Sequence, residues 1–107
     1  MDYTRTNLKG LLGASVITLS DNMTLAEQDR AFVLVVNATA SGKTLTLGLP
    51  DGACCIVING GSNTFTLKNV SGDTGTSVAS AGIYLVKASQ EANASRVFEL
   101  GGSGGGK

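Results

Sequence analysis

The sequence has no histidine and no tryptophan, and it carries only two cysteines, which are adjacent at Cys54 and Cys55. Without histidine, the chain lacks the side chain that most often serves as a general base or a metal ligand near neutral pH. Adjacent residues of a strand point to opposite faces, so these two thiols cannot share one metal ion or form a relaxed disulfide with each other. We therefore expect no metal and no cofactor. We interpret both cysteines as buried and reduced, with an intersubunit disulfide as the alternative.

Charge is also scarce: only 15% of the residues are charged, and eight basic side chains balance eight acidic ones. A chain without excess positive charge has no field that attracts nucleic acid or an anionic membrane, so we expect neither as a partner. The sequence shows no secretion signal and no apolar run long enough to cross a bilayer, which predicts synthesis in the cytoplasm. Serine and threonine outnumber the charged residues, which favours contact with protein or sugar.

Helical periodicity is almost absent. Only residues 24–30 favour a helix, and because that stretch spans barely two turns we expect a turn or polar loop there. Residues 43–68 set the pattern of the chain instead, with leucines that alternate with threonines, an apolar run at 54–58, and turn sequences at 50–52 and 59–62. We interpret this stretch as three antiparallel strands with two tight connections.

Similar short runs recur along the whole chain. Together they predict an all-β fold, an antiparallel β-sandwich or jelly-roll-like domain of about eight short strands. We expect an N-terminal extended arm over residues 1–13, the β-sandwich domain over 14–100 and a glycine-rich tail over 101–107. No internal repeat is evident, and no segment is long enough for the helix that usually joins parallel strands. The strands are expected at 15–20, 31–38, 44–49, 54–58, 64–68, 76–79, 83–88 and 95–100.

Asp73 opens the sequence Asp73-Thr74-Gly75-Thr76, which matches the catalytic motif of the aspartic proteases. That chemistry needs two carboxylates that share a proton, each on a loop beneath an apolar strand. No apolar run precedes Asp73, and the sequence shows no second element of this kind. The same residue types are common in ordinary loops. We therefore predict no catalytic residues and no enzymatic activity.

One pattern of strands and turns spans about half of the chain. The run LTLGLPDGACCIVINGGSNTFTLKNVSGDTG is followed by an apolar strand that opens with Gly82 and by a last short strand at Arg96-Val97-Phe98. This pattern resembles small β-domains of tailed-bacteriophage virion proteins: capsid decoration proteins, head fibres, and tail-fibre or tail-spike modules. The chain departs from the fibre proteins in being far too short for a complete fibre and in lacking a collagen-like or coiled-coil shaft.

The resemblance implies a non-enzymatic structural protein that forms a homo-oligomer, with a trimer expected, on the capsid surface of a virion. As a decoration protein it would bind the major capsid protein or another virion protein and stabilise the shell. The alternative is a receptor- or glycan-binding module of a phage tail fibre or spike.

Two groups of residues are candidates for these contacts. The arm and the central strands present more apolar surface than a small sandwich needs, so we expect apolar side chains there to bind a partner chain. For the alternative function, polar loop residues and one tyrosine ring would contact a glycan. The partner-binding candidates are Leu8, Leu11, Leu12, Phe32 and Val36, and the glycan-contact candidates are Ser62, Asn63, Asn69, Asp73, Thr74 and Tyr84.

Overall fold

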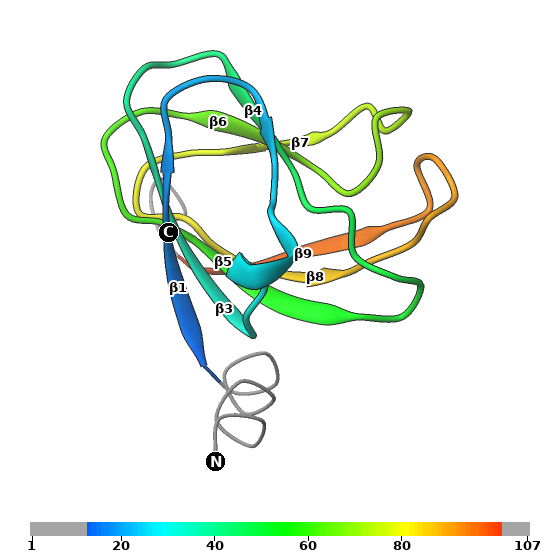
Figure 1. Cartoon of the computed structure of the whole chain (residues 1–107). Helices are drawn as coiled ribbons and strands as arrows, with labels where there is room; N and C mark the ends of the chain where they lie inside the picture. Colours follow the sequence, from blue (N-terminus) through cyan, green and yellow to red (C-terminus); the bar gives the residue numbers. More distant parts are fainter. Residues whose placement is uncertain (1–12, 102–107) are drawn as a thin grey trace.

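The computed structural model describes residues 13–101, so the candidates Leu8, Leu11 and Leu12 lie outside the described residues. Almost all regular secondary structure of the described chain is strand, which confirms the all-β prediction (Figure 1). One short 3-10 helix, η1 (Glu27–Asp29), lies in the stretch where a turn was expected. The strands are β1 (Ala14–Leu19), β2 (Met23–Thr24), β3 (Val33–Ala38), β4 (Lys43–Thr46), β5 (Cys54–Asn59), β6 (Phe65–Lys68), β7 (Thr76–Val78), β8 (Ile83–Lys87) and β9 (Arg96–Gly101).

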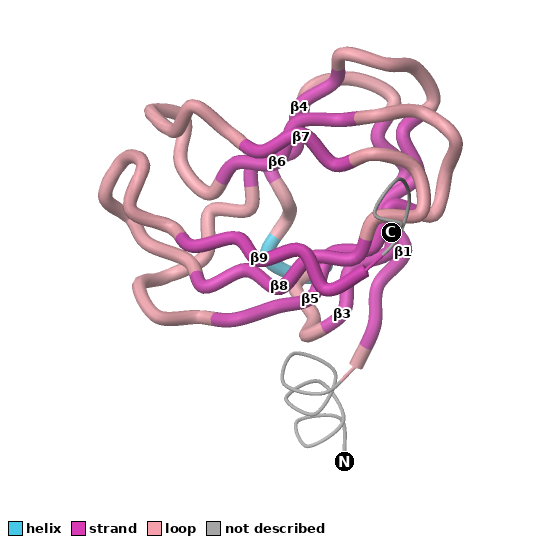
Figure 2. Tube along the Cα trace, turned by 180° about the vertical axis from the view of Figure 1, so that it is seen from behind, coloured by secondary structure: helices cyan, strands magenta, loops and turns pink. Residues whose placement is uncertain are grey.

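These strands form two sheets that face each other. Sheet A contains β1, β3, β5, β8 and β9 in that order, and sheet B contains β2, β4, β6 and β7. Figure 2 shows the sheets as two layers, with β9, β8, β5 and β3 in one and β4, β6 and β7 in the other. Alternate residues of both sheets point into the shared core. Its most buried large side chains are Leu19, Leu34, Val36, Leu45, Leu47, Val57, Phe65, Val78 and Val86.

Both sheets are mixed, so the prediction of antiparallel sheet is wrong for the pairs formed among the first six strands. β1 pairs in parallel with β3, β3 with β5, β2 with β4, and β4 with β6. The antiparallel pairs are β5 with β8, β6 with β7, and β8 with β9. The strands β4, β5 and β6, which were expected to be neighbours, alternate between the sheets: β4 and β6 pair in sheet B, and β5 lies in sheet A.

The parallel pairing arises because the chain passes from one sheet to the other after each of its first strands. Ala14 lies beside Val33, and Val33 lies beside Ile56. One circuit of the chain, from sheet A through sheet B and back to sheet A, therefore takes about 20 residues. Parallel neighbours need a long return connection, and here a strand of the opposite sheet supplies it in place of a helix. After β6 the chain reverses, and β7, β8 and β9 add the antiparallel pairs at this end.

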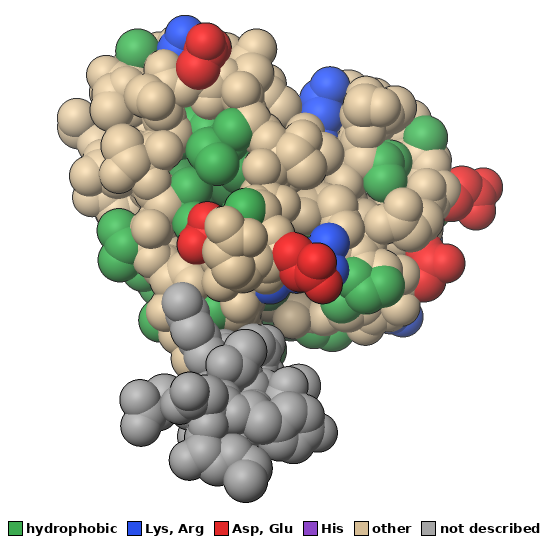
Figure 3. Space-filling model, viewed as in Figure 1, with side chains coloured by type: hydrophobic (Ala, Val, Ile, Leu, Met, Phe, Trp, Pro, Cys, Tyr) green, Lys and Arg blue, Asp and Glu red, His purple; other side chains and the backbone are tan. Residues whose placement is uncertain are grey.

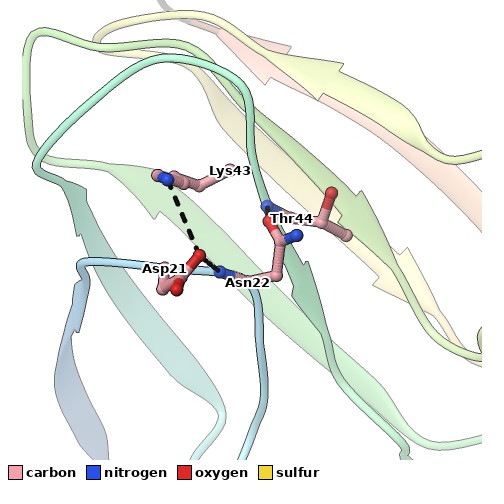
Figure 4. Close-up of polar contacts among 4 residues, drawn as sticks. All are labelled: Asp21, Asn22, Lys43 and Thr44. Carbon is pink, nitrogen blue, oxygen red and sulfur yellow. Dashed lines mark hydrogen bonds and ion pairs between the residues drawn. The ribbon is translucent and has the colours of Figure 1, made fainter.

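Polar side chains hold the first two circuits together where the chain leaves sheet A. Asn22 Oδ1 accepts a hydrogen bond from the Thr44 backbone N–H at 2.9 Å, and Lys43 Nζ lies 3.6 Å from an Asp21 carboxylate oxygen (Figure 4). The Asn22 backbone N–H also donates to Asp21 Oδ1 at 2.8 Å. This hydrogen bond and the Lys43 charge hold the pKa of Asp21 below its usual value.

A buried asparagine fastens the chain where β5 ends. Asn59 Nδ2 donates to the carbonyls of Asn63 and Val78, and Asn59 Oδ1 accepts from the Gly61 N–H. The side chain therefore satisfies backbone groups of the turn that leaves sheet A and of β7 in sheet B. Buried backbone groups without a partner cost free energy, so these bonds fix the path between the sheets.

Candidate functional site

The face of sheet A that points away from sheet B carries two rows of apolar side chains. Every second residue of a strand points to the same face. The alternate, inward positions of β1, β3 and β5 are buried, so the residues between them face outward. The strand register aligns these residues across the sheet. We call them the outer apolar face: Ala14, Val33, Ile56, Leu85 and Phe98 in one row, and Val16, Val35, Ile58 and Ile83 in the other.

Neither row contains a polar or charged residue. Val16 and Phe98, on the two edge strands, are 76% and 54% exposed, and the residues between them are half-buried against their neighbours. Beyond the two rows this face is polar: Lys87 and Arg96 follow the first row, and Thr18 and Asn37 follow the second. Contiguous apolar patches of more than a few hundred Å² are uncommon on monomeric proteins and mark interaction sites.

The outer face of sheet B has the opposite chemistry. Its inward residues, such as Leu45 and Leu67, are fully buried, and its outward positions carry hydroxyl groups and one lysine. In the view of Figure 3, acidic and basic side chains stand in small separate groups on a largely uncharged surface. The outward rows of sheet B are Thr44, Thr66 and Ser77, and Thr24, Thr46 and Lys68.

The structure changes which residues of β3 are candidates for partner binding. Val36 has no exposed area and points into the core, which corrects its prediction as a partner contact. Phe32 is half-buried just before β3. Because the sequence of β3 is apolar on both faces, it does not reveal which residues point outward; the register assigns Val33 and Val35 to that face.

The glycan-contact candidates are not brought together at one place. Ser62 and Asn63 precede β6, whereas the other loop candidates follow it at the far end of the strand. Asn63 Nδ2 donates to the Ala38 carbonyl at 3.0 Å. Tyr84 lies on β8 and packs against the core, and burial together with the Glu99 carboxylate raises its pKa.

Asn69 is buried and bonded to the backbone of two connections. Its Nδ2 donates to the carbonyls of Leu49 and Ser89 at 3.1 and 2.8 Å, and its Oδ1 accepts from the Leu49 N–H at 2.9 Å. Leu49 follows β4 in sheet B, and Ser89 follows β8 in sheet A. The Asn69 side chain therefore joins the two sheets, and its polar atoms are used within the chain.

Asp73 has a similar structural role. Its carboxylate accepts hydrogen bonds from the backbone N–H groups of Asn69, Val70 and Asn93 at 2.9, 3.2 and 2.6 Å. Burial pushes the pKa of Asp73 up, but these bonds and the Lys68 charge outweigh it, so the pKa lies below its usual value. This geometry keeps the carboxylate ionised as a loop anchor, whereas the protease motif needs a carboxyl that shares a proton.

A small hollow lies beside this loop, between residues of the two sheets. It has a volume of about 130 Å³ and is lined by Leu47 and Leu67 of one layer and by Val86 and others of the opposite layer. At its rim the Thr74 N–H donates to Asn93 Oδ1 at 2.7 Å. Pockets for drug-sized ligands are larger, on the order of 300–1,000 Å³. The hollow offers little room for a substrate.

The two cysteines lie on opposite faces of β5, as their adjacency requires. Cys55 is buried, but Cys54 is exposed, so the prediction that both are buried is wrong for Cys54. Burial and the neighbouring Cys54 raise the pKa of Cys55 to about 12. Within residues 13–101, no group of three or more His, Cys, Asp or Glu side chains is placed to hold a metal ion. No helix in this part of the chain is long and apolar enough to cross a membrane.

Comparison with protein-family models, curated proteins and solved structures found no match for this chain. The resemblance to phage virion domains therefore stays a prediction from the pattern of strands and turns. The outer apolar face is the feature of the molecule from which a function can be inferred.

Proposed function

We propose that this protein is a non-enzymatic structural component of a bacteriophage virion that binds the major capsid protein on the capsid surface and stabilises the shell. In our interpretation, the two facing sheets form a sandwich-like domain with one hydrophilic and one apolar outer face. The observation that carries the proposal is the outer apolar face, which spans all five strands of sheet A without a polar residue in either row. The trimer implied by the sequence resemblance stays a prediction.

The energetics of burial support a binding role for this face. Apolar surface removed from water contributes roughly 25 cal/mol per Å², so covering a patch of a few hundred Å² contributes several kcal/mol before the costs of association. Val16 and Phe98 contribute most, because both are more than half exposed in the single chain. A partner that covers the face would recover this free energy.

The chemistry of the face also defines its partner. The rows carry no charge, so the matching surface of the capsid protein is expected to be apolar and flat enough to lie along a sheet. Binding of this kind depends little on ionic strength, because screening weakens interactions between charges and leaves apolar contacts in place. Salt therefore distinguishes this contact from electrostatic adsorption.

Co-sedimentation with empty capsids, assembled from the shell protein of the same source, tests the proposal. We expect the natural chain to sediment with capsids at both 50 mM and 500 mM salt. The double variant Ile56→Lys, Leu85→Lys places two charges at the centre of the outer apolar face and is expected to weaken binding more than tenfold. The matched variant Thr44→Lys, Thr66→Lys places the same charges on sheet B and is expected to bind normally.

Circular dichroism of both variants serves as the folding control. A strictly monomeric chain that does not sediment with capsids would overturn the proposal. Equal loss of binding in both variants would also contradict it, because it would show that the outer apolar face has no special role.

A further inference from the structure

Among the four edge strands of the described chain, β1 alone lacks a feature that discourages pairing with another strand. β2 has two residues and β7 has three. β9 carries the charged residues Arg96 and Glu99, and its register with β8 is irregular beside Ile83. Short length, charge and irregularity are the usual protection of sheet edges. The six residues of β1, ASVITL, are uncharged and contain no proline, and their register with β3 is regular.

The backbone groups at this edge can be identified from the hydrogen bonds on the other side of β1. The Val33 N–H donates to the Gly13 carbonyl, and the Thr39 N–H donates to the Leu19 carbonyl. Odd-numbered residues of β1 therefore bond toward β3, because the backbone groups of alternate residues point to the same side of a strand. The N–H and C=O groups of Ala14, Val16 and Thr18 consequently point to the free edge.

We propose that β1 pairs antiparallel with β1 of a second copy of this chain, with Val16 opposite Val16 across a two-fold axis. In this register Ala14 lies opposite Thr18 of the other copy. All free edge groups of both strands then form interchain hydrogen bonds, because each opposing pair consists of residues whose N–H and C=O groups point toward each other. Shifting the centre to Ile17 would leave Ala14 without an opposing residue in the partner strand.

Side-chain sizes and faces agree with this register. Directly opposite residues of an antiparallel pair lie on the same face of the sheet. Val16 is β-branched and 76% exposed, and pairing places it against an identical side chain. Ala14 and Thr18, both exposed in the single chain, are small enough to lie opposite each other.

The other three edges explain why the occupant is the same strand of a second copy. Head-to-tail pairing of β1 with β9 would place the charged and irregular strand against β1, and β2 and β7 are too short to match it. An isologous contact uses the same surface twice and closes after two copies, so it does not continue into a filament. Two-fold pairing therefore also removes the exposed edge.

This pairing adds an oligomeric state to the proposed function, and its biological role rests on that function. The two-fold axis stands normal to the sheet, so the outer apolar faces of both copies lie on the same side. The pair presents to a capsid the outer apolar faces of two five-stranded sheets side by side, with Thr18 of each copy at the seam. The expected unit is a dimer, in contrast to the trimer that the sequence resemblance implies.

Disulfide cross-linking of the full chain tests the register. All variants carry Cys54→Ser, because Cys54 is the exposed native thiol. The Cα atoms of a hydrogen-bonded antiparallel pair are about 5.5 Å apart, within the range of a disulfide. We expect Val16→Cys to give a cross-linked dimer on mild oxidation. Ala14→Cys and Thr18→Cys are matched controls: each alone gives no cross-linked dimer, and an equimolar mixture gives a cross-linked heterodimer.

A proline variant separates edge pairing from side-chain packing. Val16→Pro removes an N–H that points away from β3, so the pairing within the chain is retained, as for prolines at natural sheet edges. We expect it to be monomeric by light scattering, whereas Val16→Ala, which keeps the edge N–H, still dimerises. A natural chain that is monomeric or trimeric, a Val16→Cys variant without cross-link, or a dimeric Val16→Pro variant would each overturn the pairing.

The outcomes separate this inference from the proposed function. If the natural chain binds capsids but the Val16→Cys variant gives no cross-link, the pairing is overturned and the proposed function stands. Cross-linked dimers that do not bind capsids would support the pairing and overturn the capsid role.

Discussion

The outer faces of the two sheets show how differently one short chain treats two exposed surfaces. Sheet B alternates buried leucine with outward threonine, so its outer face binds water through hydroxyl groups. Sheet A carries valine, isoleucine and leucine in the two middle rows of its outer face, and polar side chains such as Thr18 and Asn37 lie beyond them. Both sheets share one core, so the difference does not come from a requirement of folding. The contrast supports our proposal that the outer apolar face contacts other chains.

The inner faces of both sheets should be equally important for stability. Substitutions there should give the largest change in the free energy of unfolding. Leu45→Ala removes a fully buried side chain of sheet B and should lower the free energy of unfolding by about 2–5 kcal/mol. Leu34→Ala in sheet A should cost a similar amount. Urea unfolding measures both. Thr44→Ala, on the outer face next to Leu45, is the control and should change stability by less than about 1 kcal/mol.

The loop that contains Asp73 joins β6 and β7 of sheet B, and the Asp73 carboxylate accepts a hydrogen bond from Asn93 in the connection between β8 and β9 of sheet A. This contact makes stability depend on pH. The pKa of Asp73 is lowered in the folded state, so its contribution is fully present above the unfolded pKa near 3.8 and is lost as the pH falls through the folded value. Asp73→Asn should cost about 1–2 kcal/mol at pH 7 and should flatten the loss of stability below pH 4. Thermal unfolding from pH 2 to 7 measures this, with Glu91→Gln as the exposed control. An unchanged profile in the Asp73 variant would contradict the anchoring role.

Exchanging the chemistry of the two outer faces tests the comparison itself. Val35→Thr with Ile58→Thr gives sheet A part of the surface of sheet B, and we expect a folded protein whose stability changes by about 1 kcal/mol or less. Binding of an apolar fluorescent dye should fall. The reverse change, Thr44→Val with Thr66→Val, should raise dye binding and promote self-association. An unfolded Val35→Thr, Ile58→Thr variant would show that the outer apolar face serves folding.

The smallest change compares the two faces of one strand. A thiol reagent at pH 8 should label Cys54 in the native protein, whereas Cys55 should stay unlabelled because it is buried and its pKa is raised to about 12. Mass spectrometry should find one label in native protein and two in urea. Rapid double labelling without denaturant would show that the inner face of β5 opens to solvent.

The sequence predicts the strands well, because alternation and turn chemistry are local properties. Each of the eight predicted strands overlaps a strand of the structure, and Gly52 in the predicted turn has a positive φ of 83°. β2 was missed because two residues carry no periodic signal. The parallel pairing was missed for a different reason: alternation is the same in parallel and antiparallel strands, and the return path through the opposite sheet leaves no helical signature.

The candidate site was only partly predictable. The two-sided apolar runs at β3 and β5 indicated surface beyond the needs of the core, but choosing Val35 over Val36 requires the register. Asn69 and Asp73 illustrate the opposite problem. Polar residues in a loop look alike in sequence whether they await a ligand or bind the backbone of the same chain. Here the hydrogen bonds of both side chains show that they bind the backbone of the same chain.

The winding of the chain between the sheets has a consequence for its biosynthesis. Each of the early strands emerges from the ribosome before its parallel neighbour exists, and the antiparallel partners of β5 and β6 come last. An isolated pair of strands is marginal in water, so the nascent chain has no three-stranded sheet until β5 and β6 have been synthesised. Ribosome-bound chains that end before residue 54, extended by a linker that fills the exit tunnel, should accordingly be cut rapidly by protease, and protection should appear only in chains that also contain β5 and β6.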